Sequence, residues 1–88
     1  MTKKVYFEPK AKDEYESWKE ENDKIFKRIR ELIKDIKQDP FKGLGKPEPL
    51  RHGLKGYLSR RIDKVHRLVY AVTDEAIIVI SCKHHYEK

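Results

Sequence analysis

An apolar stripe with helical spacing constrains the fold of this chain more than any other feature of its sequence. The stripe consists of Ile25, Ile29, Leu32, Ile33 and Ile36. Because these positions are three and four residues apart, they lie on one face of a helix, and Phe26 widens that face. Asn22 or Asp23 is a suitable N-cap, and Asp39-Pro40 marks the end, because the residue before a proline disfavours helical geometry.

The segments before and after this helix predict further elements. Residues 4–7 favour a strand, and three apolar residues spaced four and three apart predict a first helix over residues 11–21. Residues 41–50 hold two glycines and two prolines, so we expect an ordered loop without any regular element.

Three further strands are predicted in the second half of the chain. Alternating patterns favour strands over residues 54–62 and 66–72, and a turn at 73–75 joins the latter to a hairpin partner over 76–83. The order is therefore βααβββ. We expect an α+β fold in which two N-terminal helices pack on one face of an antiparallel-dominated, twisted sheet, leaving the other face free to bind.

The length of the chain predicts one small domain, which we place at residues 1–88. No apolar run approaches the roughly 20 residues of a membrane span, and the N-terminus has no apolar stretch of signal-peptide length. The single Cys82 has no partner for an internal disulfide and is expected in the core. These features favour a cytoplasmic protein without a membrane partner.

The net charge of +6 is unevenly distributed. Residues 40–88 contain ten Lys and Arg against five Asp and Glu, together with all four histidines, whereas residues 8–39 are nearly balanced. A basic, histidine-rich half beside a balanced one favours a polyanionic partner. Ordinary solubilising charge is the alternative explanation.

Strand alternation directs several cations of the basic half to one surface, away from the helices. They are Arg61, Arg67 and Lys83, accompanied by His85. Val69 and Ala71 are expected to face outward beside them. Because guanidinium groups pair with two phosphate oxygens at once, this surface predicts a phosphate site, with a solvated basic face as the alternative.

The residues of this surface match the chemistry of RNA cleavage. Attack by the 2′-hydroxyl of RNA needs a base for that hydroxyl, cations for the charge that develops on phosphorus, and an acid for the departing 5′-oxygen. Glu48, held between two prolines, is a candidate base, and His85 is a candidate acid. Arg67 and Arg61 are candidate cations, and no metal or other cofactor is required. Taken singly, a solvated loop glutamate and an idle histidine are simpler explanations.

Two other residue types have ambiguous roles. Tyr57 and Tyr86 are candidates for stacking on unpaired bases, although tyrosine also fills strands without any such role. His84 and His85 do not predict a zinc site, because neighbours on a strand point to opposite faces.

Four motifs in fixed order make the chain resemble a known family. They are Gly45-Lys46-Pro47-Glu48-Pro49-Leu50, Ser59-Arg60-Arg61-Ile62, His66-Arg67-Leu68-Val69-Tyr70-Ala71-Val72 and His85-Tyr86. Over essentially the whole chain the sequence resembles the YoeB (Txe) toxins of the RelE superfamily. The resemblance implies a RelE-like fold and a bacterial type II toxin. Such a toxin is an endoribonuclease that binds the ribosome at the A site and 16S rRNA and cuts the mRNA there. It is neutralised by a YefM-type antitoxin. The resemblance also implies a homodimer.

The resemblance further implies roles for residues at matching positions. Glu48 matches the general base, Arg67 the phosphate-stabilising arginine, His85 the general acid and Tyr86 the tyrosine that helps to shape the site. Further positions implied to touch RNA or ribosome are Lys46, Arg51 and Arg61.

The chain departs from the family pattern in two places. Glu87 and Lys88 follow the tyrosine at which such toxins often end, and Leu58 stands where an aromatic residue often precedes the Ser-Arg-Arg run. Two other functions stay open: a non-catalytic toxin of the same fold that inhibits DNA gyrase, as ParE-like toxins do, and a basic protein that only blocks the ribosome. The retained acid–base residues favour the enzyme over both.

Overall fold

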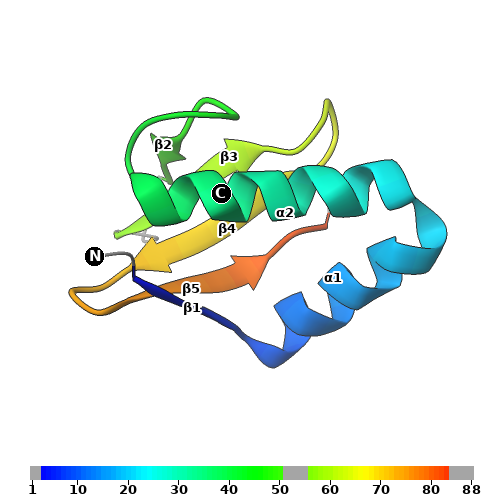
Figure 1. Cartoon of the computed structure of the whole chain (residues 1–88), viewed down its shortest axis with the longest axis horizontal. Helices are drawn as coiled ribbons and strands as arrows, with labels where there is room; N and C mark the ends of the chain where they lie inside the picture. Colours follow the sequence, from blue (N-terminus) through cyan, green and yellow to red (C-terminus); the bar gives the residue numbers. More distant parts are fainter. Residues whose placement is uncertain (1–2, 51–55, 84–88) are drawn as a thin grey trace.

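The computed structural model describes residues 3–50 and 56–83, which form two helices and five strands (Figure 1). In chain order these are β1 (Lys4–Phe7), α1 (Pro9–Glu21), α2 (Asp23–Gln38), β2 (Glu48–Pro49), β3 (Tyr57–Arg61), β4 (Arg67–Val72) and β5 (Ala76–Ser81). The predicted placement of two helices between the first strand and the others is confirmed. The structure adds one strand, β2.

The two helices are separated by a single residue, Asn22. Its backbone is extended, and its side-chain Oδ1 accepts hydrogen bonds from the backbone N–H groups of Lys24 (3.1 Å) and Ile25 (3.3 Å). Asn22 is therefore the residue that caps α2. α1 begins at Pro9, two residues earlier than predicted, because proline suits the first helical turn, where its missing N–H is not needed. Among the described residues, no helix has the length and apolar character to cross a membrane.

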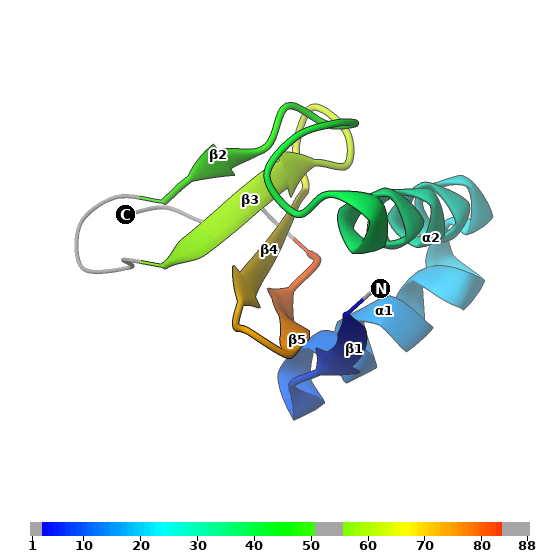
Figure 2. The same ribbon diagram turned by 60° about the vertical axis from the view of Figure 1, so that its left-hand side comes forward.

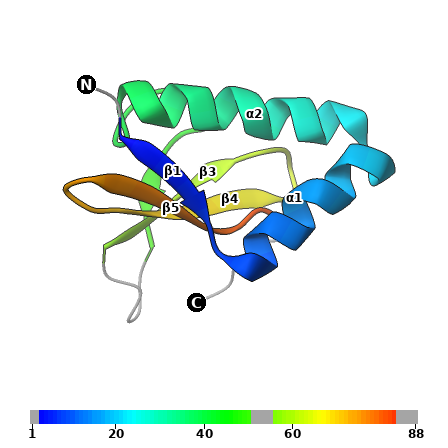
Figure 3. The same cartoon turned by 60° about the horizontal axis from the view of Figure 1, so that its bottom comes forward.

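The strands form one mixed sheet in the order β1-β5-β4-β3-β2. β1 is parallel to β5, and every other neighbouring pair is antiparallel. Both helices lie on the same face of this sheet, as Figure 2 shows. β1, at one edge of the sheet, leads directly into α1 (Figure 3). The predicted α+β fold is confirmed.

The segment over residues 41–50 contains a short strand that the sequence pattern did not predict. Glu48 and Pro49 pair with Ser59 and Leu58 of β3 at the edge of the sheet. Proline is tolerated there because one side of an edge strand needs no backbone partner. The expectation of a loop without any regular element is therefore wrong, and the added strand carries Glu48 onto the sheet.

The core lies between the helices and the sheet. The stripe of α2 contributes four buried side chains: Phe26, Ile29, Leu32 and Ile36. From α1, the buried Trp18 donates from Nε1 to the carbonyl oxygen of Cys82 (2.9 Å). Cys82 is buried as predicted, and burial raises the pKa of its thiol to about 12.

A β-bulge changes which residues of β5 share a face. Val69 of β4 pairs with Ser81, whereas the next residue, Tyr70, pairs with Val79. Ile80 is therefore the additional residue of the bulge. As a result, Ser81 lies beside Val69 on the face away from the helices, while Tyr70 and Val79 point into the core.

Candidate active site

A row of residues crosses the sheet on the face away from the helices. The register pairs Glu48 with Ser59, Ser59 with Val69, and Val69 with Ser81. Ser59, Val69 and Ser81 are at most 3% exposed, and Ala71 is 9% exposed. Val69 and Ala71 therefore lie on the face away from the helices, as expected, but their side chains are buried and not exposed to solvent. Glu48 lies at the edge of the sheet, and its side chain is 53% exposed, in contrast to the three buried residues of the row.

Arg67, at the start of β4, joins two members of this row. Its Nη1 donates to Ser59 Oγ (2.9 Å), and its Nη2 lies 3.5 Å from Glu48 Oε2. The side chain of Arg67 is only 16% exposed, so the guanidinium lies against the sheet and covers the short side chain of Ser59. The structure thus brings two predicted site residues, Glu48 and Arg67, into contact from different strands.

Arg61 lies beside Arg67, because the two residues are register partners in the β3–β4 pair. The backbone N–H of Arg61 donates to the carbonyl oxygen of Gly45 (2.7 Å), which fixes the chain just before β2. Gly45 has φ +78°, and a Cβ atom there would lie 2.9 Å from the Arg61 carbonyl oxygen, so glycine is required. The exposed Lys46 follows, also with a positive φ of 51°.

Tyr57 lies at the other end of β3. Its carbonyl oxygen accepts a hydrogen bond from the backbone N–H of Leu50 (3.0 Å), which ties the end of β2 to β3. Its half-buried side chain lines an apolar hollow of about 490 Å³ with Pro47 and Pro49. The prolines that flank Glu48 are thus part of a surface next to the site.

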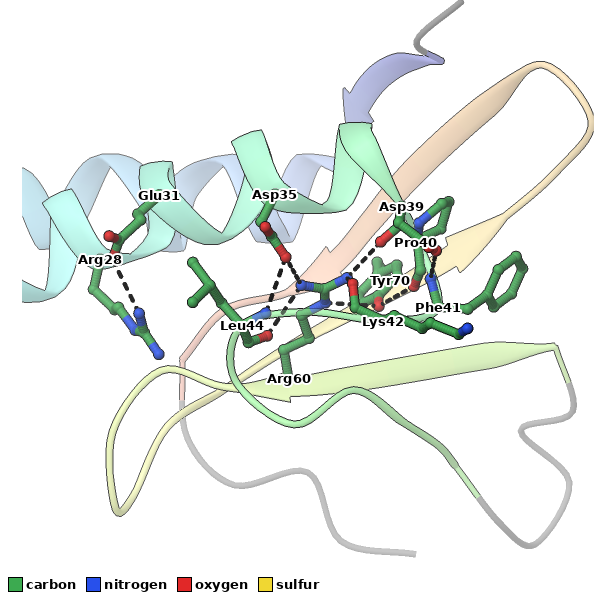
Figure 4. A network of polar contacts seen from close by, with 10 residues as sticks. All are labelled: Arg28, Glu31, Asp35, Asp39, Pro40, Phe41, Lys42, Leu44, Arg60 and Tyr70. Atoms are coloured by element: carbon green, nitrogen blue, oxygen red, sulfur yellow. Dashed lines mark hydrogen bonds and ion pairs between the residues drawn. The ribbon is translucent and has the colours of Figure 1, made fainter.

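The loop from α2 to β2 is anchored by Arg60, a fully buried residue of β3 (Figure 4). Its guanidinium donates to the hydroxyl of Tyr70, the carboxylate of Asp35 and the carbonyls of Asp39, Lys42 and Leu44. These five contacts measure 2.6 to 3.1 Å, and they match the five N–H donors of an arginine. A single side chain therefore holds the loop against both α2 and the sheet.

Two pKa shifts follow from this anchor. Hydrogen bonds from Arg60 and from the backbone N–H of Leu44 lower the pKa of Asp35 below its ordinary value. Burial raises the pKa of the Tyr70 hydroxyl, which donates to the carbonyl oxygen of Pro40 (2.6 Å). Asp35 therefore stays ionised as the counter-charge of Arg60, while Tyr70 stays neutral as a donor to the loop.

Lys83 does not lie on the surface where alternation placed it. Its Nζ donates to Ser17 Oγ (2.8 Å), pairs with Glu21 (3.1 Å) and lies 4.8 Å from the centre of the Trp18 ring. These three residues belong to α1, on the side of the sheet that the helices cover. The prediction fails because β5 ends at Ser81, so strand alternation no longer applies two residues later.

Three predicted site residues, Arg51, His85 and Tyr86, lie outside the described residues. Within residues 3–50 and 56–83, no three His, Cys, Asp or Glu side chains come together in a way that could hold a metal ion.

Sequence reasoning missed two residues that position the site, Ser59 and Arg60. Because side chains alternate along a strand, Arg60 shares a face with the apolar Leu58 and Ile62, and a charge on a core-facing position must be paired. That was the available signal for Arg60. Ser59 has no comparable signal, because its role depends on the register that aligns β2 with β3.

The described residues form an arrangement suited to a phosphate ester. Glu48 offers an exposed carboxylate that can accept a proton, and the guanidinium of Arg67 lies within reach of the same reacting group. Arg61 adds a second guanidinium on the same face. A base and an anion-binding group are thus adjacent on a rigid sheet.

Comparisons with known proteins identify the class of this protein. Residues 7–86 match a family model described as a YoeB-like toxin of the bacterial type II toxin–antitoxin system. Toxin YoeB of Escherichia coli strain K12 is 49% identical over 83 residues, covering 94% of this chain and 99% of the relative. The chain is therefore a toxin of the bacterial type II toxin–antitoxin class.

Solved structures agree with this class. The YoeB dimer from Staphylococcus aureus superposes with a TM-score of 0.91 at 42% identity, covering 98% of this chain and 100% of that chain. A YoeB–YefM complex from the same organism superposes with a TM-score of 0.87 at 44% identity, with the same coverage. The chain belongs to the YoeB toxin family.

Proposed function

We propose that this toxin is a ribosome-dependent endoribonuclease that cuts mRNA in the ribosomal A site and so inhibits translation. The observation that carries the proposal is the pair of Glu48 and Arg67, 3.5 Å apart on the sheet face away from the helices, with Arg67 held on the buried Ser59. A proton acceptor beside a fixed cation is what the attack of a 2′-hydroxyl on its neighbouring phosphate requires.

In the proposed mechanism, Glu48 takes the proton of the 2′-hydroxyl while the 2′-oxygen forms a bond to phosphorus. Arg67 stabilises the negative charge that develops on the phosphoryl oxygens. The bond from phosphorus to the 5′-oxygen then breaks, and His85 donates a proton to that oxygen. The products are a 2′,3′-cyclic phosphate and a free 5′-hydroxyl. The roles of His85 and of the site-shaping Tyr86 rest on the family resemblance.

Other residues of the chain are proposed to bind RNA or the ribosome. These are Lys46, Arg51, Tyr57 and Arg61. Lys46 and Arg61 are supported by their exposure beside the Glu48 strand. Lys83 is left out of this set, because its ammonium group is engaged with α1.

The proposed partners are a YefM-type antitoxin, a second copy of the chain, and the ribosome with its mRNA in the bacterial cytoplasm. The first two are supported by the complex and the dimer of the Staphylococcus aureus relative. Size-exclusion chromatography with light scattering tests the dimer. Co-purification with the product of a neighbouring small gene tests the antitoxin.

The test of the function is primer extension on a defined mRNA in a bacterial cell-free translation reaction. The wild-type chain should produce cuts at A-site codons, and the same mRNA without ribosomes should stay intact. Glu48→Gln should remove the cuts without changing the unfolding midpoint. Intact mRNA with halted translation would replace the proposal by a ribosome blocker. Intact mRNA with normal translation would redirect the search to DNA gyrase.

A further inference from the structure

A basic hollow, separate from the apolar hollow beside Tyr57, adjoins the candidate active site at the turn between β3 and β4. It has a volume of about 490 Å³ and is lined by Arg28, Arg61, Ile62, Asp63, Lys64 and Arg67. Arg67, which lies 3.5 Å from Glu48, and its neighbour Arg61 thus also line this hollow. Arg28 comes from α2, Arg61 from β3, Lys64 from the turn and Arg67 from β4, so four segments supply the cations of the hollow.

The charge of the hollow is strongly unbalanced. Four cationic side chains face one carboxylate, that of Asp63. Asp63 Oδ1 already accepts hydrogen bonds from the backbone N–H groups of Val65 (2.9 Å) and His66 (2.7 Å), which shape the turn. The carboxylate is therefore committed to the backbone, and the hollow keeps an excess of positive charge.

The cations of the hollow are available to an anion at small cost. Arg28 pairs with Glu31 (3.0 Å), and the carboxylate of that pair is 59% exposed. Exposed ion pairs of this kind contribute little to stability, so an anion can readily replace Glu31 as the partner of Arg28. Lys64 makes no ion pair or hydrogen bond with its side chain among the described residues.

We infer that this hollow binds a second backbone phosphate of RNA, next to the phosphate held by Arg67, with Arg28 and Lys64 as its added ligands. The inference rests on the proposed function for the Glu48–Arg67 end of the surface. Arginine forks and an ammonium group suit phosphate oxygens. An acidic protein segment is less favoured, because Ile62 is the single apolar residue among the described residues of the lining and offers little to anchor a side chain.

The first experiment measures binding to a short single-stranded RNA whose 2′-hydroxyls are replaced by hydrogen, so that it cannot be cut. Fluorescence anisotropy compares the wild type with the double variant Arg28→Gln/Lys64→Gln. The matched control is Arg30→Gln/Lys34→Gln, which removes the same residue types from a different face of α2. Unfolding midpoints of all three proteins are recorded to exclude a fold defect.

Counterion release sets the expected size of the effect. Loss of one phosphate contact on a single strand reduces the slope of log affinity against log salt by about 0.7 and weakens binding about fivefold at 0.1 M salt. The double variant should show this reduction or more, whereas the control should keep the wild-type slope. Equal slopes and affinities for the two double variants would overturn the inference.

The phosphate can come from mRNA or from ribosomal RNA, and a second experiment distinguishes these sources. Ribosomes are programmed either with mRNA that fills the A site or with mRNA truncated before it. If the double variant loses affinity for both, the phosphate belongs to ribosomal RNA. If it loses affinity only when the A site holds a codon, the phosphate belongs to mRNA. If it loses affinity for neither, the hollow does not serve on the ribosome and the inference fails.

Two further outcomes separate this inference from the proposed function. A wild-type chain that cuts no mRNA but shows the expected change of salt slope would refute the nuclease and leave the phosphate site standing. A wild-type chain that cuts mRNA, with a double variant indistinguishable from the control, would refute only the phosphate site. A poly-glutamate peptide that binds more tightly than RNA, and whose binding needs Arg28 and Lys64, would assign the hollow to an acidic protein instead.

Discussion

The anchor of the α2–β2 loop makes a strong prediction for Asp35→Ala. Asp35 Oδ2 lies 2.6 Å from Nη1 of Arg60, whose side chain is fully buried. Removing one partner of a buried ion pair costs about 3–5 kcal/mol, because the remaining charge stays buried without compensation. Since Arg60 keeps four other acceptors and Asp35 is 30% exposed, we expect the lower end, about 3 kcal/mol.

A loss of this size is a large part of the stability of the chain. A domain of 88 residues is stable by about 4–13 kcal/mol, so the variant should still fold but with a small margin. In thermal unfolding, about 3 kcal/mol corresponds to a midpoint lower by roughly 12–24 °C. Urea unfolding, followed by far-UV circular dichroism and by Trp18 fluorescence, measures the free energy of unfolding directly.

The matched control is Glu31→Ala, one turn earlier on α2 (Figure 4). Glu31 pairs with Arg28 at 3.0 Å, but the two side chains are 59% and 33% exposed. An exposed pair of this spacing contributes about 0.3–0.5 kcal/mol. If the unfolding free energies of the two variants lie within 1 kcal/mol of each other, the loop is not held by Arg60 in the way we describe.

Three other predictions follow from the same contacts. The pKa of Asp35 is lower in the folded chain than its unfolded value of about 3.8, so the ionised carboxylate stabilises the fold fully above that value. This stabilisation is lost as the pH falls through the lower, folded pKa. When the free energy of unfolding is measured against pH, Asp35→Asn should therefore lose stability less steeply below about pH 4 than the wild type. Ser59→Ala removes the acceptor that orients Arg67, so the rate of mRNA cleavage should fall roughly tenfold while the unfolding free energy changes by less than about 1 kcal/mol; an unchanged rate would deny Ser59 its orienting role. Gly45 (φ +78°) and Gly56 (φ +89°) both have positive φ, but a Cβ atom at Gly45 would lie 2.9 Å from a backbone oxygen, whereas one at Gly56 would meet no atom within 4 Å. Urea unfolding should therefore show Gly45→Ala to be less stable than Gly56→Ala by at least about 1 kcal/mol.

The helices and central strands were predictable because their patterns are local. The stripe of α2 and the cap at Asn22 are both encoded within a few residues, and the structure confirms them. β2 was not predictable in this way, because its two residues form a strand only by pairing with β3. The same limit applies to the bulge at Ile80, which depends on how β5 meets β4.

The candidate site was predictable where single strands determine it. Arg61 and Arg67 lie on the face expected from alternation. Glu48 was expected in a loop and reaches the same face through the pairing of β2 with β3. Lys83 was misplaced because alternation was extended past the end of β5. The anchoring role of Arg60 requires knowing where a loop distant in sequence returns to the sheet, which no local pattern contains.

The contacts of the loop that carries Glu48 support the catalytic role that we propose for this residue. Arg60 fixes its first half, the Gly45–Arg61 hydrogen bond fixes its middle, and β2 pairs its end with β3. Backbone contacts therefore position Glu48 without any bound ligand. Such preorganisation favours a rapid chemical step, since little reorganisation is needed when the substrate binds.

The most direct test of the central claim is single-turnover cleavage on ribosomes whose A site holds a codon with one 2′-deoxynucleotide at the cut position. The account predicts that the wild-type chain cuts the all-ribose mRNA to a 2′,3′-cyclic phosphate and leaves the deoxy-substituted mRNA intact. It also predicts that Glu48→Gln cuts neither. Cleavage of the deoxy-substituted mRNA at an undiminished rate would contradict attack by the 2′-hydroxyl, and with it the role proposed for Glu48 as its base.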